Sequence, residues 1–423
     1  MRRVRMLGWA LLGLAPWAQA GDETEEARTW QLEGYGTLAA HVADDKVVGV
    51  RGDGRNRNPS YDGKLRFDGD SLLAVQARVD LSPRVHAVWQ LLARDDVRYG
   101  QRPRNEWIYL GWDAQPNLNL KLGRTALPVF LHSETRHLGY AQLTARPVNT
   151  VYQLNPFTHV DGLALRHGRS MGRGELRTEF SAGRAELALP SGTIDADRMV
   201  SLALRYDEGP WSLRLAGSDY RFDMRLANVQ RLYSQLVSGA TGCTNCATVL
   251  AARAPLEGVH AQVQAMALQH ESGSWSFTAE LARRSSNNSI VADSLAWYTL
   301  LAYRVGEWSP YAVLGAIRFR EPPLGLQTHP AAPAAARRAN ALIDLYLQTP
   351  NDRRITQLGV RWDLHARAAL KLQWERYRAT REGRVLGQSH YLEVPAPPPI
   401  GPYQGPAWDG RVNQWSLNLD FVF

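Results

Sequence analysis

The chain has 423 residues, a formal net charge of +8 at pH 7 and only two cysteines. A basic balance is compatible with nucleic acid, an anionic membrane surface or an anionic solute as a partner. After the first twenty residues there is no run of 18 apolar residues, so no transmembrane helix is expected.

The first twenty residues have the three parts of a secretory signal peptide. The basic opening MRRVR is followed by an apolar stretch over 6–17 and by an A-x-A cleavage site at 18–20. We therefore expect a signal peptide at 1–20 and one mature domain at 21–423. Removing three arginines lowers the formal charge from +8 to +5. Export argues against nucleic acid as a partner.

Segments that alternate apolar and polar residues recur from Trp30 to the last residue. In one of them, Leu118, Leu120 and Leu122 alternate with Asn117, Asn119 and Lys121. A period of two is typical of β-strands with one apolar face. The predicted strands lie at 30–42, 72–81, 84–94, 106–113, 117–123, 160–168, 174–184, 198–207, 210–220, 258–271, 274–284, 294–306, 308–320, 353–364, 366–379 and 412–423.

The connections between these sixteen segments alternate between long and short. Transmembrane barrels have an even number of strands, with short periplasmic turns and long extracellular loops. A soluble sandwich also alternates along its strands, but it does not sort its connections by length at opposite ends. We therefore predict an all-β fold, a transmembrane antiparallel β-barrel of sixteen strands. Tryptophans at strand ends, such as Trp211, Trp275 and Trp308, are typical of interfacial aromatic girdles.

The stretch from Gly123 to Gly162 differs from an ordinary surface loop. Between Thr125 and Thr158 it has a single glycine, three prolines and four aromatic residues. Structureless loops of this length are uncommon in compact domains and are usually functional. We predict that 124–159 folds into the barrel as a constriction loop that sets the width and charge of the pore.

The chain resembles the outer-membrane porins of Gram-negative bacteria. The resemblance rests on the leader, the sixteen strands and the tail NQWSLNLDFVF. In porins the last strand ends in an aromatic assembly signal, which Phe423 matches, and the third loop is the constriction loop. The resemblance implies a homotrimer in the outer membrane, in contact with lipid and lipopolysaccharide and inserted by the outer-membrane assembly machinery.

The constriction stretch itself is similar to a group of proteobacterial porins. The matching residues are Leu122 to Arg124, Leu127-Pro128, Ser133-Glu134, Gly139 to Ala141, Arg146-Pro147, Val151-Tyr152 and Asp161-Gly162. Val148 stands where that group often has a second proline, so the loop departs from the pattern there.

A pore selects by the charges at its narrowest point. The candidate constriction residues are Glu134, Arg136, Tyr140, Arg146 and Tyr152. Alternation predicts fourteen inward bases: Arg78, Arg84, Arg94, Lys121, Arg166, Arg177, Arg205, Arg214, Arg284, Arg304, Arg318, Arg320, Arg361 and Lys371. The eight predicted inward acids are Asp80, Glu175, Glu179, Asp207, Glu280, Asp363, Glu375 and Asp420. The surplus of six bases predicts a positive lumen, unless the arginines pair with neighbouring carboxylates and leave little net field.

We therefore expect a passive channel for small hydrophilic solutes with a mild preference for anions. The alternative is a substrate-specific channel for phosphate, carboxylates, sugars or an acidic polysaccharide. An outer-membrane enzyme is less favoured, because no G-x-S-x-G elbow accompanies Ser133. His132, His137 and His159 are expected to be hydrogen-bonded rather than metal ligands, and no cofactor is expected. Cys243 and Cys246 are expected to close a small disulfide loop.

Overall fold

The computed structural model describes residues 30–239, 241–347, 352–379, 391–395, 398, 400–406 and 408–423. The predicted signal peptide at 1–20 lies outside these residues. In the described part of the chain, no helix is long and apolar enough to cross a membrane.

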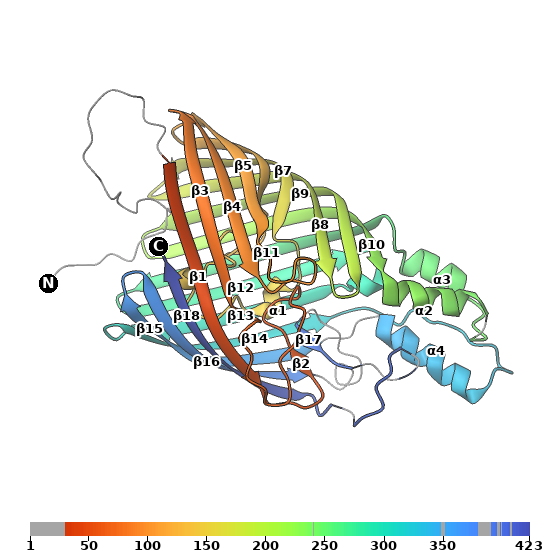
Figure 1. Ribbon diagram of the computed structural model, residues 1–423. Helices are drawn as coiled ribbons and strands as arrows, with labels where there is room; N and C mark the ends of the chain where they lie inside the picture. The colour runs from red at the N-terminus through yellow and green to blue at the C-terminus, as the bar shows by residue number, and fades with distance from the viewer. Residues whose placement is uncertain are drawn as a thin grey trace, which may run out of the picture.

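Sixteen antiparallel strands close into a barrel, which confirms the predicted fold (Figure 1). Each strand pairs with its neighbours in sequence, and the first and last strands pair at the seam, from Tyr35 opposite Val422 to Ala43 opposite Gln414. The strands are β1 (Trp30–Ala43), β3 (Leu72–Ser82), β4 (Val85–Arg94), β5 (Arg104–Gln115), β6 (Leu118–Ala126), β7 (His159–Met171), β8 (Gly174–Leu189), β9 (Gly192–Glu208), β10 (Trp211–Leu226), β11 (Val259–Ser272), β12 (Trp275–Ser286), β13 (Ser294–Tyr303), β14 (Trp308–Phe319), β15 (Arg353–His365), β16 (Ala368–Ala379) and β18 (Arg411–Val422).

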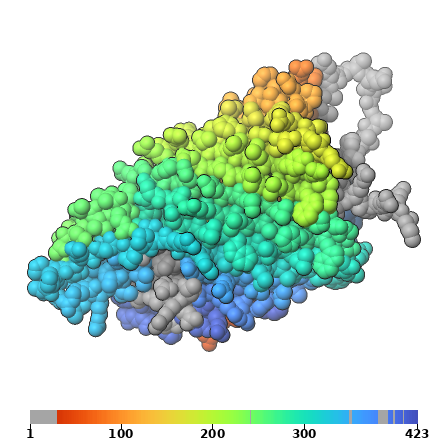
Figure 2. Space-filling model, turned by 180° about the vertical axis from the view of Figure 1, so that it is seen from behind, coloured from red at the N-terminus to blue at the C-terminus, as the bar shows by residue number. Residues whose placement is uncertain are grey.

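Short helices and one small sheet lie in the long loops. The two-residue strands β2 (Gly49–Val50) and β17 (Leu392–Glu393) pair with each other. The helical elements are η1 (Gly139–Ala141), α1 (Asn149–Tyr152), α2 (Ala227–Val237), α3 (Cys246–Arg253), η2 (Ser289–Val291) and α4 (Ala334–Leu347). Helices α2, α3 and α4 project beyond the long-loop end of the barrel (Figures 1 and 2), and Cys243 and Cys246 are joined by a disulfide beside α3.

One predicted long loop is a hairpin instead. Strands β8 and β9 run on to a turn at Pro190 and Ser191, across the stretch expected to be the loop 185–197. The inward side chains of Leu187, Leu189 and Ile194 keep the alternation going, and they are buried. Two features interrupt the pattern, the short Pro-Ser-Gly turn at the tip and a β-bulge in β9 between Ala196 and Met199, and together they made the hairpin look like a loop.

The outer face of the barrel is an apolar belt. Leucines that point outward are exposed to the surroundings; they include Leu32, Leu38, Leu110, Leu122, Leu163, Leu215, Leu314, Leu358, Leu372 and Leu417. Figure 2 shows this face over the middle strands as one continuous surface. A patch of this extent is unfavourable in water and favourable in lipid. At the end with short turns, aromatic rings pair on neighbouring strands, as where Trp308 and Trp362 stack with centroids 4.8 Å apart.

Two glycines lie beneath aromatic rings at the seam. Gly34 exchanges two backbone hydrogen bonds of 2.9 Å with Phe423, and Gly36 is paired with Phe421. A Cβ atom added to Gly36 would lie 2.4 Å from Cζ of Phe421, and one added to Gly34 would lie 2.1 Å from Cζ of Phe423. The missing side chains therefore make room for the two rings on the lipid-facing side.

Candidate functional site

Residues 127–158, here called L3, connect β6 to β7 and lie inside the barrel. Inward side chains of the wall donate hydrogen bonds to the irregular backbone of L3. The Lys371 ammonium binds the carbonyl oxygens of Gly139 and Thr144 at 2.7 and 3.1 Å, and Asn418 Nδ2 binds that of Ala145 at 3.0 Å. Irregular backbone at membrane depth needs such internal partners, because lipid provides none.

The single glycine of L3 lies at a close approach to the wall. A Cβ atom at Gly139 would lie 2.1 Å from the Asp420 carboxylate and 2.9 Å from the Thr37 hydroxyl. The same carboxylate forms an ion pair of 2.8 Å with Lys371. The absence of a side chain at Gly139 therefore allows the loop backbone to lie directly against the ion pair of Lys371 and Asp420.

One side of L3 packs on an apolar wall. Helix α1 lies against β12, β13 and β14. Its residues Val151 and Tyr152 are buried, as is Phe130, whose ring centroid is 5.0 Å from that of Tyr152. The wall residues in the same cluster are Met199, Tyr220, Tyr298, Val313, Ile317 and Ile355. This packing explains why the loop is rich in apolar residues.

The opposite side of L3 is held by buried ion pairs. The Arg146 guanidinium contacts Asp70 at 2.6 Å, Ser416 at 2.7 Å and Glu375 on the inner wall. Asp70 belongs to residues 44–71, here called L1, which connect β1 to β3. Because each charge has an opposite partner, the cost of burying it is offset.

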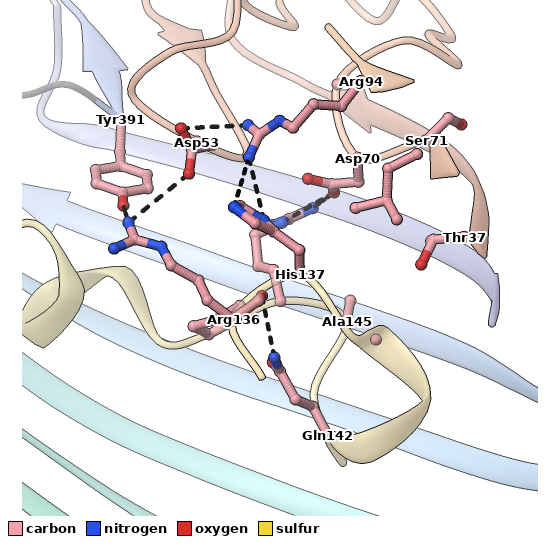
Figure 3. A pocket seen from close by; sticks show the side chains of 16 residues that line it. Thr37, Asp53, Asp70, Ser71, Arg94, Arg136, His137, Gln142, Ala145 and Tyr391 are labelled. Carbon is pink, nitrogen blue, oxygen red and sulfur yellow. Dashed lines mark hydrogen bonds and ion pairs between the residues drawn. The ribbon is translucent and has the colours of Figure 1, made fainter. Parts of the chain in front are cut away.

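A second group of charges joins L1 to L3 around a cavity of about 50 Å³ (Figure 3). Asp53 lies 3.2 Å from Arg94 and 3.7 Å from Arg136, and Arg136 also donates to the Tyr391 hydroxyl at 2.9 Å. Burial alone would raise the pKa of Asp53, but the guanidinium groups of Arg94 and Arg136 hold the pKa of this carboxyl well below its usual range.

His137 completes this group as a neutral ring. Its Nδ1 lies 3.2 Å from Arg94, and its Nε2 lies 3.6 Å from Glu106. Burial, with Arg94 nearby, lowers the pKa of His137 to about 3. At neutral pH the ring therefore accepts from Arg94 rather than competing with it as a second cation.

The five predicted constriction residues divide into two groups. Arg136, Arg146 and Tyr152 are buried and attach the loop to its surroundings. Glu134 is 46% exposed and forms an ion pair with Arg166. Tyr140 is partly exposed; its hydroxyl donates to the Ala366 carbonyl at 2.7 Å, in the short turn between β15 and β16.

Below L3, the predicted lumen charges line the periplasmic half of the barrel largely as pairs. Arginines and carboxylates two residues apart share one face of a strand, as in Arg205 with Asp207 at 2.9 Å. Arg78 with Asp80 at 3.0 Å and Arg361 with Asp363 at 2.7 Å repeat this arrangement. Pairing reduces the positive field that the surplus of bases predicts. Lys121 differs: its ammonium lies 4.9 Å from the ring centroid of Tyr109.

Several predicted pore-lining residues are placed differently, among them Lys371, whose side chain is fully buried against L3. Arg318 is paired with Leu295 and is exposed on the outer face, which corrects its inward assignment. The inner face of this part of β14 is apolar because α1 packs there, at Val313 and Ile317, so alternation did not identify the polar face. Arg84 lies exposed in the turn between β3 and β4. Arg94 is inside the barrel, but buried.

The charges of L1 and β5 were not identified from the sequence. Asp53 and Asp70 lie in L1, which was not among the predicted site residues, and Glu106 was not among the predicted inward acids. In the structure Arg104 donates to Glu106 at 3.0 Å, and both are buried. The partners of Asp53 and Asp70 are far apart from them in sequence, so no local pattern identified these pairs, whereas Arg104 and Glu106 share one face of β5.

Above L3, at the extracellular end, lies a cavity of about 500 Å³. Leu154 and Phe157 of L3 line it, with Phe222 and Met224 of β10 and Val263 of β11. Above L3 the interior is thus largely apolar on the side of β10 and β11, whereas the charges of L1 lie on the side of β4 and β5.

Neither a protein-family model nor a curated protein sequence matches the chain. Solved structures do match. The anion-selective porin from Comamonas acidovorans is 11% identical with a TM-score of 0.53, covering 93% of this chain and 100% of that one. OmpF of Salmonella typhi, in complex with daunomycin, is 10% identical with a TM-score of 0.53, covering 94% and 98%. The outer-membrane channel DcaP of Acinetobacter baumannii is 11% identical with a TM-score of 0.53, covering 96% and 100%.

The chain therefore has the fold of the outer-membrane porins. Together with the apolar belt on its outer face, this fold locates the chain in the outer membrane of a Gram-negative bacterium.

Proposed function

We propose that the chain forms a narrow channel through which small hydrophilic solutes diffuse across the outer membrane, with a mild preference for anions. The observation that carries this proposal is the charged face below L3. Its bases remain in contact with the lumen, since the side chains of Arg78, Arg166 and Arg304 are 34%, 37% and 38% exposed. Partly hydrated charges of this kind select ions by sign while letting water pass.

Lys121 sets the direction of the preference. The arginines share their charge with carboxylates, whereas the Lys121 ammonium lies over an uncharged ring. Burial would raise the pKa of Glu134, but the charges of Arg166 and then Lys121 lower it, so this carboxylate offsets part of the Lys121 charge. The proposed selectivity is mild because only the remainder acts on passing ions.

Reversal potentials in a KCl gradient across a planar bilayer test this proposal. The wild type should show a modest anion preference, and Lys121→Gln should shift the potential toward cation preference. Arg318→Gln is the matched control, because it removes the same charge from the outer face. A cation-selective wild type would overturn the anion preference, and equal shifts in the two variants would overturn the role of Lys121. A wild type without conductance would overturn the channel itself.

A substrate-specific channel is the second candidate, and the apolar cavity above L3 favours it. A general pore for hydrophilic solutes has no need of a wall of Phe222, Met224 and Val263 at its entrance. Selective uptake would appear as conductance that one class of solute blocks at low concentration.

We further propose a homotrimer inserted by the outer-membrane assembly machinery, with Phe423 as its signal and with lipid and lipopolysaccharide around it. The porin fold and the exposed ring of Phe423 at the seam support this. Light scattering of the protein in lipid nanodiscs should give three copies per particle. A single copy would overturn the trimer.

A further inference from the structure

The cavity above L3 has the size and lining of a small-molecule site. Its volume of about 500 Å³ falls in the range of roughly 300–1,000 Å³ that is usual for ligand pockets. L3, the inner faces of β10 and β11, and helices α2 and α4 surround it. Most of the lining is apolar, including Leu154, Phe157, Phe222, Met224, Val263 and Phe319.

Two cations line the cavity, and they differ in their partners. Arg51 forms an ion pair with Glu393, which also lines the cavity, whereas Arg284 enters from the inner face of β12. Its guanidinium donates to the carbonyls of Ala292 and Leu154 at 3.1 and 3.5 Å, and to the Ser294 hydroxyl at 3.3 Å. Among the described residues, none of its hydrogen bonds goes to a carboxylate. It thus differs from the paired arginines below L3.

Asn228 adds a further polar group at the edge of the cavity. Its Nδ2 donates to the Tyr346 hydroxyl at 3.0 Å. Within the described part of the chain, its Oδ1 is buried and has no hydrogen-bond partner. This oxygen needs a donor, which an ionised carboxylate lacks, so Asn228 does not bear on the choice of an anionic ligand.

We propose that this cavity binds a monocarboxylate with an aryl or alkyl body. The hydrogen bonds of Arg284 leave one of its five N–H groups for a ligand. A charged donor that is not hydrogen-bonded to an acid favours an anion, with which it forms a charge-assisted hydrogen bond. The apolar lining then covers the body of the ligand. A phosphate would need more donors than one arginine supplies, and a sugar would leave most of its hydroxyls facing apolar side chains. The inference rests on the second candidate function, a substrate-specific channel, and names its substrate class.

Isothermal titration calorimetry on the protein in lipid nanodiscs tests the inference, with empty nanodiscs as the blank. The probes are cinnamate, acetate and cinnamyl alcohol, which separate the charge from the apolar body. Cinnamate should bind at least about tenfold more tightly than either of the other two, because only it uses both features. Equal affinity for cinnamate and acetate would overturn the inference.

Two variants locate the binding. Arg284→Gln should weaken cinnamate about tenfold and leave cinnamyl alcohol unchanged. Ala261→Phe should weaken both, because Ala261 lines the cavity and a phenyl ring would fill it. The matched controls are Arg283→Gln and Ala312→Phe, at exposed positions on the outer face. Cinnamate affinity unchanged in Arg284→Gln would overturn the inference even if Ala261→Phe does not fold.

Conductance is measured separately, so the two proposals fail in different ways. A channel that conducts but binds no cinnamate overturns this site and leaves the general channel in place. Cinnamate binding by a protein that does not conduct overturns the channel proposal and leaves the site.

Discussion

Arg146 of L3 and Asp70 of L1 form a buried ion pair, with Nη2 of the guanidinium 2.6 Å from the carboxylate. Both side chains are at most 10% exposed. The two residues are 76 positions apart in the sequence, so the pair joins two separate loops. The same guanidinium also contacts Glu375 on the wall. This one side chain therefore holds L3 both to L1 and to the barrel wall.

Arg146→Ala should release this side of L3. It leaves the Asp70 and Glu375 carboxylates buried without a cation, and breaking a buried pair in this way costs about 3–5 kcal/mol. The free energy of unfolding in urea should fall by that order, and single-channel conductance should rise. Arg166→Ala is the control, since its ion pair with Glu134 is partly exposed. A stable Arg146→Ala channel of unchanged conductance would contradict the attachment.

Phe130→Ala should loosen the opposite side of L3. The ring is 2% exposed and packs against Tyr152, so its removal leaves a cavity. Loss of a buried phenyl ring costs about 3–5 kcal/mol, whereas Phe130→Leu should cost much less. Urea unfolding checks the order of the two variants. Equal stability of wild type and Phe130→Ala would mean that L3 does not pack on the wall.

Acid should weaken the junction between L1 and L3 through His137. The folded pKa of His137 is lowered to about 3, whereas an unfolded histidine titrates near about 6.5. The unfolded chain therefore binds the proton first as the pH falls, and stability decreases below about pH 6.5. Asp53 and Glu106 face the ring, and their negative charges act to raise its pKa in the folded state, which limits the loss of stability in acid.

His137→Gln should remove about one proton from this dependence. The slope of unfolding free energy against pH should become shallower by up to about 1.4 kcal/mol per pH unit between pH 6 and 4. Burial also lowers the pKa of His132, to about 4, so the His137→Gln variant should keep part of the wild-type slope. An identical slope in both proteins would contradict a neutral His137.

Gly36→Ala should disturb the seam. Its new Cβ would lie 2.4 Å from the ring of Phe421, so the ring must move. We expect a lower temperature for the loss of heat-resistant mobility in electrophoresis, and recovery when Phe421→Leu removes the ring. Gly217→Ala is the matched control, because nothing lies within 4 Å of a Cβ atom there. If Gly36→Ala, its double variant with Phe421→Leu, and Gly217→Ala all melted at the same temperature, a side chain at Gly36 would not disturb the ring of Phe421.

The strands were predictable because lipid imposes one apolar face on each of them. Leu120 and Leu122 face outward while Lys121 faces the lumen, as the alternation predicts. The rule failed where the inner face is also apolar, and this is why Arg318 was misplaced on β14. Alternation records which residues meet lipid, but not what fills the interior.

The attachment of L3 was only partly predictable. Its apolar composition predicted that it folds inward, and the packing of Phe130 and Tyr152 on the wall explains that composition. Whether Arg136 and Arg146 face the pore depends on acids such as Asp53 and Asp70, which come from another loop. No local pattern records such long-range partners.

The seam also has a consequence for the kinetics of folding. It pairs Tyr35 with Val422, two residues from opposite ends of the chain. All other strand pairs of the barrel join neighbours in sequence, so the chain between two paired strands is never longer than one loop. Contacts between distant residues are slow to form, because their entropy cost precedes any gain from the contact. Formation of the hydrogen bonds between Gly34 and Phe423 should therefore be the last and slowest event as the barrel folds.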